Sequence, residues 1–321
     1  MELRQLGKTE LKVSPVALGC WPISGMTSLN VNEADSLATI RASIDNGVNF
    51  LDTAYNYGRN GDSERLIARA LGQDRDRVVI ATKGGLHWSP TGERVHDARP
   101  ETLKRECEES LARLQTDRVD LLYLHAPDPN TPLEDSAGAL RELLTAGKTR
   151  SVGVSNFSLA QLQEFAAICP ITACQPHYNM LQREIEQDIL PWCVAQQVSL
   201  VIYWPLMKGL LAGKLPRDHV FAPGDGRAKY PMFQGEEWQK TQDMIDALRA
   251  IAAECGKTVA QVVINWTIHQ PGITVALCGA KRAEQARDNA GGADWRLTPA
   301  QRAAIDEALR VRGPAVSRSA V

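Results

Sequence analysis

The chain has 321 residues, of which 44% are hydrophobic and 23% are charged, and its formal net charge at pH 7 is −2. This composition is typical of a globular protein with a sizeable core. The small net charge and the lack of any long basic run argue against a protein that binds nucleic acid or membrane surfaces through charge. No apolar stretch approaches the roughly 20 residues that a membrane-spanning helix requires.

The seven cysteines are scattered and form no Cys-x-x-Cys pair. This spacing fits neither a disulfide framework nor a zinc site, and we expect no bound metal. Residues 1–7 lack the apolar core of a signal peptide. These features together predict a protein of the reducing cytoplasm.

Strand-like runs alternate with amphipathic, helix-like runs along the chain. Residues 3–13 alternate in polarity and turn at Gly7, which predicts a β-hairpin. The predicted strands that follow are 16–18, 49–52, 77–82, 121–125, 151–155, 173–175, 199–203 and 273–278. The predicted helices are 32–46, 63–71, 99–114, 133–146, 159–167, 184–196 and 258–269.

This order predicts an α/β protein, a (β/α)8 TIM barrel whose N-terminal hairpin closes the bottom of the barrel. We expect one domain over residues 1–321, with the barrel at about 14–310 and a flexible tail at 311–321. Residues 87–99 and 207–236 interrupt the alternation and are predicted to be long loops that carry specificity. A doubly wound sheet is the second interpretation, but residues 19–25 lack its Gly-x-Gly-x-x-Gly turn.

Four polar residues stand at or just beyond the ends of predicted strands: Asp52, Tyr57, Lys83 and His125. The C-terminal ends of all strands in a parallel barrel meet on one face, where active sites are built. We therefore expect these side chains to form one proton-transfer site.

Several short segments, taken in order, resemble the aldo-keto reductase family over about residues 3–310. They are 51–58 (Leu51-Asp-Thr-Ala-Tyr-Asn-Tyr-Gly58), 63–64, 82–85, 124–125, 153–157, 175–179, 205–206, 209–211 and 279–289. The resemblance implies reduction of an aldehyde or ketone by hydride from a nicotinamide cofactor. The family binds this cofactor on the barrel itself, which accounts for the missing glycine-rich turn.

The resemblance implies that Tyr57 is the general acid and that Asp52, Lys83 and His125 support it. A free tyrosine has a pKa of about 10, and a neighbouring ammonium group at Lys83 is expected to lower that value. Asp52 would hold Lys83, and His125 would donate to the carbonyl oxygen. Tyr55 is the alternative donor, although the Tyr-Gly pair at 57–58 fits the family better.

The resemblance also implies a cofactor groove. Its predicted residues are Ser155, Asn156 and Gln175 for the carboxamide, Tyr203 for ring stacking, Leu206, Gly209 and Leu211 for the pyrophosphate, and Gly279, Lys281, Arg282, Gln285, Asp288 and Asn289 for the adenosine half. Lys281 and Arg282 beside a predicted helix N-terminus suit the 2′-phosphate of NADP(H), with NAD(H) as the alternative. Gln285 departs from the arginine of some relatives, which bears on this preference.

Three tryptophans that follow strands, Trp21, Trp88 and Trp204, are predicted to form an aromatic wall around a small carbonyl substrate. Neither the natural substrate nor the oligomeric state can be read from the sequence. Three alternative functions remain: a dehydrogenase that oxidises a sugar or alcohol, a cofactor-binding regulatory subunit, and a metal-dependent hydrolase. The six histidines form no His-x-His pair, which argues against the hydrolase.

Overall fold

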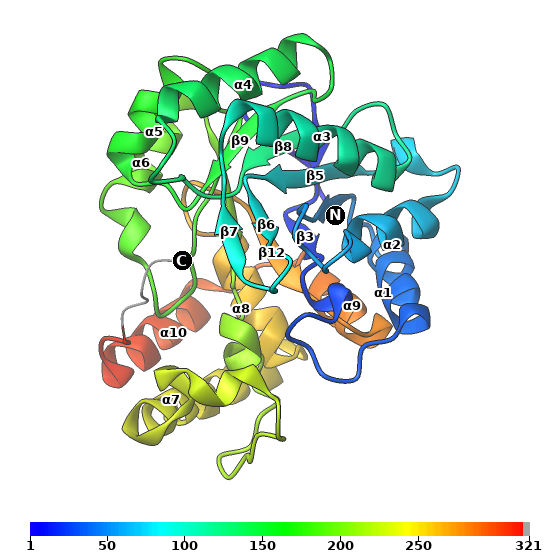
Figure 1. Ribbon diagram of the computed structural model, residues 1–321. Helices are drawn as coiled ribbons and strands as arrows, with labels where there is room; N and C mark the ends of the chain where they lie inside the picture. The colour runs from blue at the N-terminus through cyan, green and yellow to red at the C-terminus, as the bar shows by residue number, and fades with distance from the viewer. Residues whose placement is uncertain (317–321) are drawn as a thin grey trace.

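Eight parallel strands form a closed barrel in the computed structural model, which describes residues 1–316 (Figure 1). The strands are β3 (Val16–Gly19), β4 (Phe50–Asp52), β5 (Val79–Gly84), β8 (Leu121–Leu124), β9 (Val152–Ser155), β10 (Ala173–Gln175), β11 (Ser199–Tyr203) and β12 (Ile273–Gly279). All eight lie where the sequence predicts them, so the (β/α)8 barrel is confirmed. Each strand is mostly or wholly buried, as expected of strands enclosed by helices.

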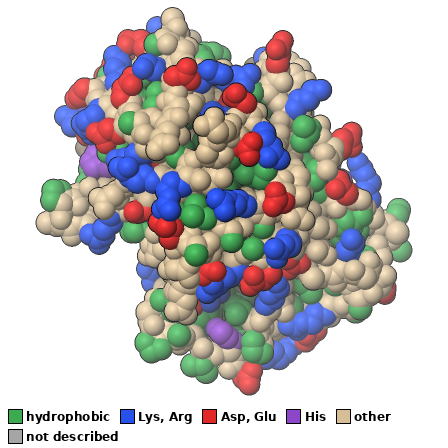
Figure 2. Space-filling view, turned by 90° about the vertical axis from the view of Figure 1, so that its right-hand side faces the viewer, with side chains coloured by type: hydrophobic (Ala, Val, Ile, Leu, Met, Phe, Trp, Pro, Cys, Tyr) green, Lys and Arg blue, Asp and Glu red, His purple; other side chains and the backbone are tan. Residues whose placement is uncertain are grey.

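Helices surround the barrel. They are α1 (Glu33–Asp45), α2 (Asp62–Leu71), α3 (Pro100–Leu114), α4 (Leu133–Thr145), α5 (Leu159–Ala166), α6 (Ile189–Gln196), α7 (Gly235–Cys255), α8 (Val259–Ile268), α9 (Ala283–Ala290) and α10 (Pro299–Arg312). Capping boxes begin three of them, at Ser158, Thr258 and Thr298. Within residues 1–316, no helix is long and apolar enough to cross a membrane. Acidic and basic side chains intermingle on the face shown in Figure 2.

The N-terminal hairpin closes the bottom of the barrel, as predicted. Its strands are β1 (Arg4–Gln5) and β2 (Lys12–Val13), and its apolar side chains Leu6, Leu11 and Val13 pack with interior barrel residues such as Phe50 and Leu121. The backbone at Gly7 has a φ of +54°, and a Cβ there would lie 2.6 Å from the carbonyl oxygen of Thr172. Only glycine fits this close contact between the hairpin and the barrel.

Other predictions differ from the structure in informative ways. The single helix predicted at 184–196 is wrong, because a 3-10 turn, η3 (Glu184–Glu186), precedes α6 and Asp188 caps α6. Residues 87–99 contain a second hairpin, β6 (Leu86–Trp88) and β7 (Arg94–His96), rather than an irregular loop. The 207–236 segment consists of the short turns η4 (Met207–Ala212), η5 (Gly226–Lys229) and η6 (Pro231–Phe233), followed by the start of α7.

The C-terminal helix α10 extends beyond residue 310, the predicted end of the barrel. Its last residue, Arg312, is buried and donates to Glu237 Oε2 of α7 at 2.6 Å. Gln182 Nε2 donates to the carbonyl oxygen of Val316 at 3.2 Å, which attaches the chain beyond α10 to the loop after β10. Of the tail predicted at 311–321, residues 317–321 lie outside the described residues.

Candidate active site

The four predicted catalytic side chains lie together at the C-terminal end of the barrel. Asp52 ends β4, Lys83 lies near the end of β5, His125 follows β8, and Tyr57 stands in the turn after β4. The ring centres of Tyr57 and His125 are 5.9 Å apart. Because neighbouring parallel strands end side by side, residues that are distant in sequence meet here.

Lys83 is the centre of the hydrogen-bond network. Its Nζ lies 2.5 Å from Asp52 Oδ1, 2.8 Å from the carbonyl oxygen of Thr53 and 3.3 Å from Tyr57 Oη. An ammonium group has three donors, and all three are used. The second carboxylate oxygen of Asp52 accepts from Gln175 Nε2 at 2.7 Å. Lys83 is therefore held in one position, with Tyr57 within its reach.

The electrostatics of the network follow from its burial. Burial lowers the pKa of Lys83, but Asp52 and Tyr57 more than offset this, and the pKa of Lys83 lies above its usual value. Burial also raises the pKa of Tyr57, against the opposing effect of Lys83. We expected Lys83 to lower the pKa of Tyr57, and it acts in that direction, but burial outweighs it. Lys83 is thus an ammonium group, and Tyr57 keeps its proton at neutral pH.

His125 is neutral in this site. Its pKa is lowered well below the usual value, first by burial and then by electrostatic interaction with Lys83, Arg94 and His96. Its Nδ1 atom is buried and has no hydrogen-bond partner among residues 1–316. A neutral imidazole still carries one N–H group, so His125 can donate to an oxygen placed beside Tyr57.

Tyr55, the alternative donor, faces a different part of the molecule. Its hydroxyl donates to Glu109 Oε2 at 2.6 Å, and the guanidinium carbon of Arg113 lies 4.2 Å from its ring centre. Both partners belong to α3, on the outside of the barrel. Tyr55 therefore points towards α3, and Tyr57 points towards Lys83.

The residues predicted to bind the carboxamide also lie together. Ser155 Oγ donates to the carbonyl oxygen of Gln175 at 2.8 Å. Asn156 Nδ2 donates to the carbonyl oxygen of His125 at 3.0 Å, and Tyr203 Oη donates to Asn156 Oδ1 at 2.7 Å. These contacts connect the ends of β8, β9, β10 and β11 into one polar rim beside the catalytic network.

The segment predicted to approach the pyrophosphate has an unusual backbone. Trp204, Met207 and Lys208 have φ values of 60°, 45° and 55°, and Gly209 follows at 87°. Left-handed non-glycine residues are costly, and they gather at functional sites. The carbonyl oxygen of Leu206 accepts from the backbone N–H groups of Gly209 and Leu211, at 2.8 and 3.2 Å.

The residues predicted for the adenosine half surround the start of α9. Lys281 Nζ donates to the carbonyl oxygen of Leu29 at 2.8 Å, and Arg282 forms an ion pair with Asp35. Gln285 Oε1 accepts from the backbone N–H of Lys281 at 2.9 Å. Asp288 contacts Lys214 and Thr258, and Asn289 donates to the carbonyl oxygen of Gly279. A Cβ added at Gly279 would lie 2.9 Å from Pro22 Cγ.

This end of the groove fits an anionic cofactor. Arg282 is the N-cap residue of α9 but makes no side-chain cap, so the first N–H groups of the helix have no capping side chain. Free N–H groups at a helix N-terminus favour a phosphate, and Lys281 adds positive charge there. The residues present therefore suit a nicotinamide dinucleotide that runs from Tyr203 towards α9.

Two of the three predicted wall tryptophans contact the turn that carries Tyr57. The ring centres of Trp21 and Tyr57 are 5.0 Å apart, and Trp88 Nε1 donates to the carbonyl oxygen of Asn56 at 2.8 Å. Trp204 instead packs edge-on to His177, at 5.4 Å between ring centres, and beneath the ammonium group of Lys208. The wall beside Tyr57 therefore comes mainly from Trp21 and Trp88.

Sequence reasoning missed two residues that act on the site electrostatically, Arg94 and His96 on β7. Both lie near enough to His125 to contribute to its lowered pKa. The available signal was a turn, Pro90 to Gly92, flanked on both sides by alternating side chains, which is typical of a hairpin.

Comparisons with known proteins agree with this geometry. The model of the aldo/keto reductase family matches residues 15–310. Aldo-keto reductase YhdN of Bacillus subtilis (strain 168) is 36% identical over 288 residues, which cover 89% of this chain and 86% of that protein. The NADH-specific methylglyoxal reductase of Escherichia coli (strain K12) is 31% identical over 312 residues, 92% of this chain and 94% of that protein.

A solved structure shows the same fold over nearly the whole chain. It is that of the glycerol dehydrogenase AKR11B4 from Gluconobacter oxydans, with a TM-score of 0.91 and 34% identity, over 98% of this chain and 97% of that one. The closed barrel, the family match and these relatives agree with one another. The chain belongs to the aldo/keto reductase family and is an NAD(P)H-dependent oxidoreductase.

Proposed function

We propose that this enzyme reduces a small aldehyde or ketone to an alcohol and that Tyr57 donates the proton. The observation that carries the proposal is the contact of 3.3 Å between Tyr57 Oη and Lys83 Nζ, with Lys83 held by Asp52 at 2.5 Å. A nicotinamide cofactor, when bound, would supply hydride to the carbonyl carbon. Side chains of the protein itself provide the proton and orient the substrate.

Each residue of the network has a role that follows from its contacts. Tyr57 gives its proton to the carbonyl oxygen as negative charge develops there. Lys83 stabilises the phenolate that remains, and Asp52 keeps Lys83 charged and fixed. His125, neutral and beside Tyr57, donates a hydrogen bond to the same oxygen and orients the substrate.

We further propose that NADPH is preferred over NADH. Arg282 is already paired with Asp35, whereas Lys281 donates to a backbone carbonyl and makes no ion pair in the described part of the chain. The charge of Lys281 is therefore available to a 2′-phosphate at the open N-terminus of α9. The E. coli relative is named NADH-specific, so family membership alone does not decide the preference.

The preference can be tested by titrating the protein with NADPH and then with NADH while following quenching of its tryptophan fluorescence. NADPH is expected to bind more tightly, and Lys281→Met is expected to weaken NADPH binding while leaving NADH binding unchanged. Lys240→Met, on the outside of α7 in an ion pair with Glu236, is the matched control. Equal affinities of the native protein for both nucleotides would overturn the preference.

A second direction of catalysis deserves the same test, because the structural neighbour from Gluconobacter oxydans is a glycerol dehydrogenase. Initial rates of carbonyl reduction and of alcohol oxidation, measured at equal cofactor saturation, separate the two. We propose reduction as the main direction.

We also infer a single-domain enzyme of the cytoplasm whose partner is a small carbonyl compound. All seven cysteines are unpaired, and six of them are buried, which suits a reducing compartment.

A further inference from the structure

The β6–β7 hairpin has two faces that differ in chemistry. Its strands pair Leu86 with His96, His87 with Val95, and Trp88 with Arg94. Directly opposed residues of an antiparallel pair lie on the same face, and residues two apart on a strand do as well. One face therefore carries Leu86, Trp88, Arg94 and His96, and the other carries His87 and Val95.

The contacts of each face show which way it points. On the second face, His87 Nδ1 lies 2.9 Å from Glu106 Oε1 of α3, outside the barrel. On the first face, Trp88 Nε1 donates to the carbonyl oxygen of Asn56, next to Tyr57. The face with Arg94 and His96 therefore looks towards the mouth of the barrel, and the hairpin lies near the centre of Figure 1.

Arg94 and His96, the polar side chains of this face, both have hydrogen-bonding atoms without a partner or an ion-pair position left open within residues 1–316. Arg94 is exposed and makes no ion pair among residues 1–316, and its guanidinium carbon lies 5.8 Å from the ring centre of Trp88. The Nδ1 atom of His96 is buried and has no hydrogen-bond partner in the same described region. After burial and Lys83, these two residues also lower the pKa of His125, so their charge reaches that imidazole.

Nearby carboxylates do not neutralise Arg94. Asp97 is paired with Arg99, and Glu106 is bonded to His87 and to the backbone N–H of Gly85 on the opposite face. Within the catalytic network, Asp52 and Lys83 balance each other. The guanidinium group of Arg94 is thus without a carboxylate partner among residues 1–316, on the hairpin face that also carries Trp88.

We propose that Arg94 and His96 form a second oxygen-binding subsite and that the enzyme favours carbonyl substrates carrying an anionic group, a carboxylate or a phosphate. This inference rests on the proposed function, because Tyr57 and His125 are taken to hold the carbonyl oxygen. A guanidinium group binds carboxylate and phosphate in the same forked geometry, so the shared chemistry is that of a planar or tetrahedral oxyanion. Trp88, next to Arg94, would pack against the carbon chain between the two groups.

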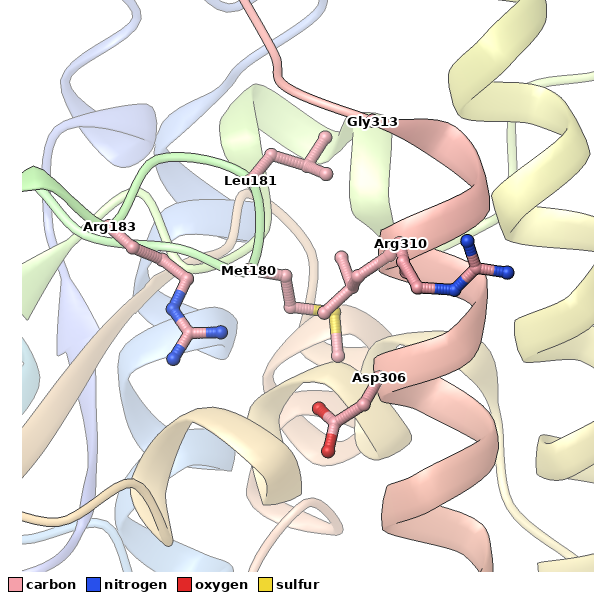
Figure 3. A pocket seen from close by; sticks show the side chains of 7 residues that line it. Met180, Leu181, Arg183, Asp306, Arg310 and Gly313 are labelled. Atoms are coloured by element: carbon pink, nitrogen blue, oxygen red, sulfur yellow. The ribbon is translucent and has the colours of Figure 1, made fainter.

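Another cavity in the structure provides less evidence of a binding site. A cavity of about 510 Å³ lies between the loop after β10 and α10, lined by Met180, Leu181, Arg183, Asp306, Leu309, Arg310 and Gly313 (Figure 3). Its two arginines are paired with acidic neighbours, Arg183 with Glu186 and Arg310 with Glu307. Its arginines therefore offer no free guanidinium group comparable to that of Arg94.

The test compares two aldehydes of similar size with the native enzyme and saturating nicotinamide cofactor, 4-carboxybenzaldehyde and 4-methylbenzaldehyde. Arg94→Met should raise KM for the carboxylate by about 10-fold to 100-fold, the range expected when a hydrogen bond to a charged group is lost. It should change kcat little for either compound and leave KM for the methyl compound unaltered. His96→Leu should raise KM for the carboxylate by a smaller factor, about 3-fold to 10-fold.

Two controls keep the result specific. Arg94→Lys should recover part of the affinity for the carboxylate, which a purely structural role of Arg94 would not explain. Arg105→Met, on the exposed side of α3 near Glu109, removes the same charge away from the mouth and should have no effect. Glyceraldehyde 3-phosphate, compared with glyceraldehyde, distinguishes a phosphate from a carboxylate as the preferred anion.

An unchanged KM for both anionic substrates in Arg94→Met would overturn the proposal, and so would an equal loss for the methyl compound. A loss confined to glyceraldehyde would point to hydroxyl recognition and would also overturn it. In each case the native enzyme still reduces aldehydes, so the proposed function stands. If the native enzyme reduces neither aldehyde despite binding the cofactor, it is the proposed function that fails.

Discussion

Each end of the barrel contains a buried carboxylate with cationic partners, and the two differ in what surrounds them. At the C-terminal end, Asp52 is paired with the fully buried Lys83, whose remaining donors reach a backbone carbonyl and Tyr57. At the N-terminal end, Asp120 accepts from Arg75 at 2.9 Å, from Arg150 at 3.0 Å and from the backbone N–H of Ile80 at 2.9 Å.

The two sites differ in what the cation contacts besides the carboxylate. The cation at the C-terminal end extends to a phenol that can release a proton, so the ion pair sets the chemistry of another group. The carboxylate at the N-terminal end joins the segments before β5, β8 and β9 and lines a cavity of about 590 Å³ with Arg75 and Arg150. The same kind of ion pair thus serves catalysis at one end and architecture at the other, as is usual for this fold.

Replacing Lys83 should have the largest effect, because it damages both chemistry and stability. Lys83→Met leaves the Asp52 carboxylate buried without a counter-charge, which typically costs about 3–5 kcal/mol of unfolding free energy. Turnover should also disappear. Urea unfolding and steady-state kinetics measure both, and adding Asp52→Asn should restore much of the stability but none of the turnover. An active, fully stable Lys83→Met enzyme would contradict this account of the C-terminal end.

Replacing Asp120 should affect stability alone. Asp120→Asn removes the charge of the hydrogen bonds to Arg75 and Arg150. A hydrogen bond to a charged group is typically worth about 1.5–3 kcal/mol. The midpoint of urea unfolding should fall while kcat and KM, measured well below that midpoint, stay within experimental error of the native values. A loss of kcat in the folded variant would show that the N-terminal end contributes to catalysis after all.

The pH dependence of reduction gives a smaller but sharper distinction. The pKa of His125 lies well below 6.5 and that of Tyr57 above 10, so His125 is neutral and Tyr57 protonated between these values. The kcat/KM for reduction should therefore be flat from pH 6.5 to pH 10. Because the unfolded state takes up a proton at His125 before the folded state does, acid below pH 6.5 should also destabilise the fold. A decline of kcat/KM centred near pH 7 would contradict these directions.

Much of the barrel could be predicted from the sequence because its strands are short, buried and apolar, and each is followed by a turn. The N-terminal hairpin was predictable for the same reason, since Leu6, Leu11 and Val13 are apolar where the chain alternates. Helices α7 and α10 went unpredicted, whereas the N-terminus of α9 was predicted beside Lys281 and Arg282. The capping box at Thr298 is a local signal for the start of α10, but its end depends on tertiary contacts such as that of Arg312 with Glu237.

The candidate site was likewise predicted only in part from the sequence. The tetrad could be predicted because each member stands at or just beyond a strand end, and parallel strands bring their ends together. The hairpin itself had a signal in the turn from Pro90 to Gly92, but the faces of β7 were not predicted, because they follow from the pairing of Arg94 with Trp88 and of His96 with Leu86. The direction of the Tyr57 pKa was mispredicted for a related reason, since burial of the phenol is a property of the assembled site.

The central claim is that Tyr57, and not the neighbouring Tyr55, provides the proton. The most direct measurement is kcat for carbonyl reduction by Tyr57→Phe and Tyr55→Phe, with cofactor affinity measured in parallel to show that both variants remain folded. Loss of a general acid typically reduces the rate by about 10²–10⁴-fold, and we expect that loss for Tyr57→Phe alone. If Tyr55→Phe lost the activity and Tyr57→Phe kept it, the assignment of the active site would be wrong.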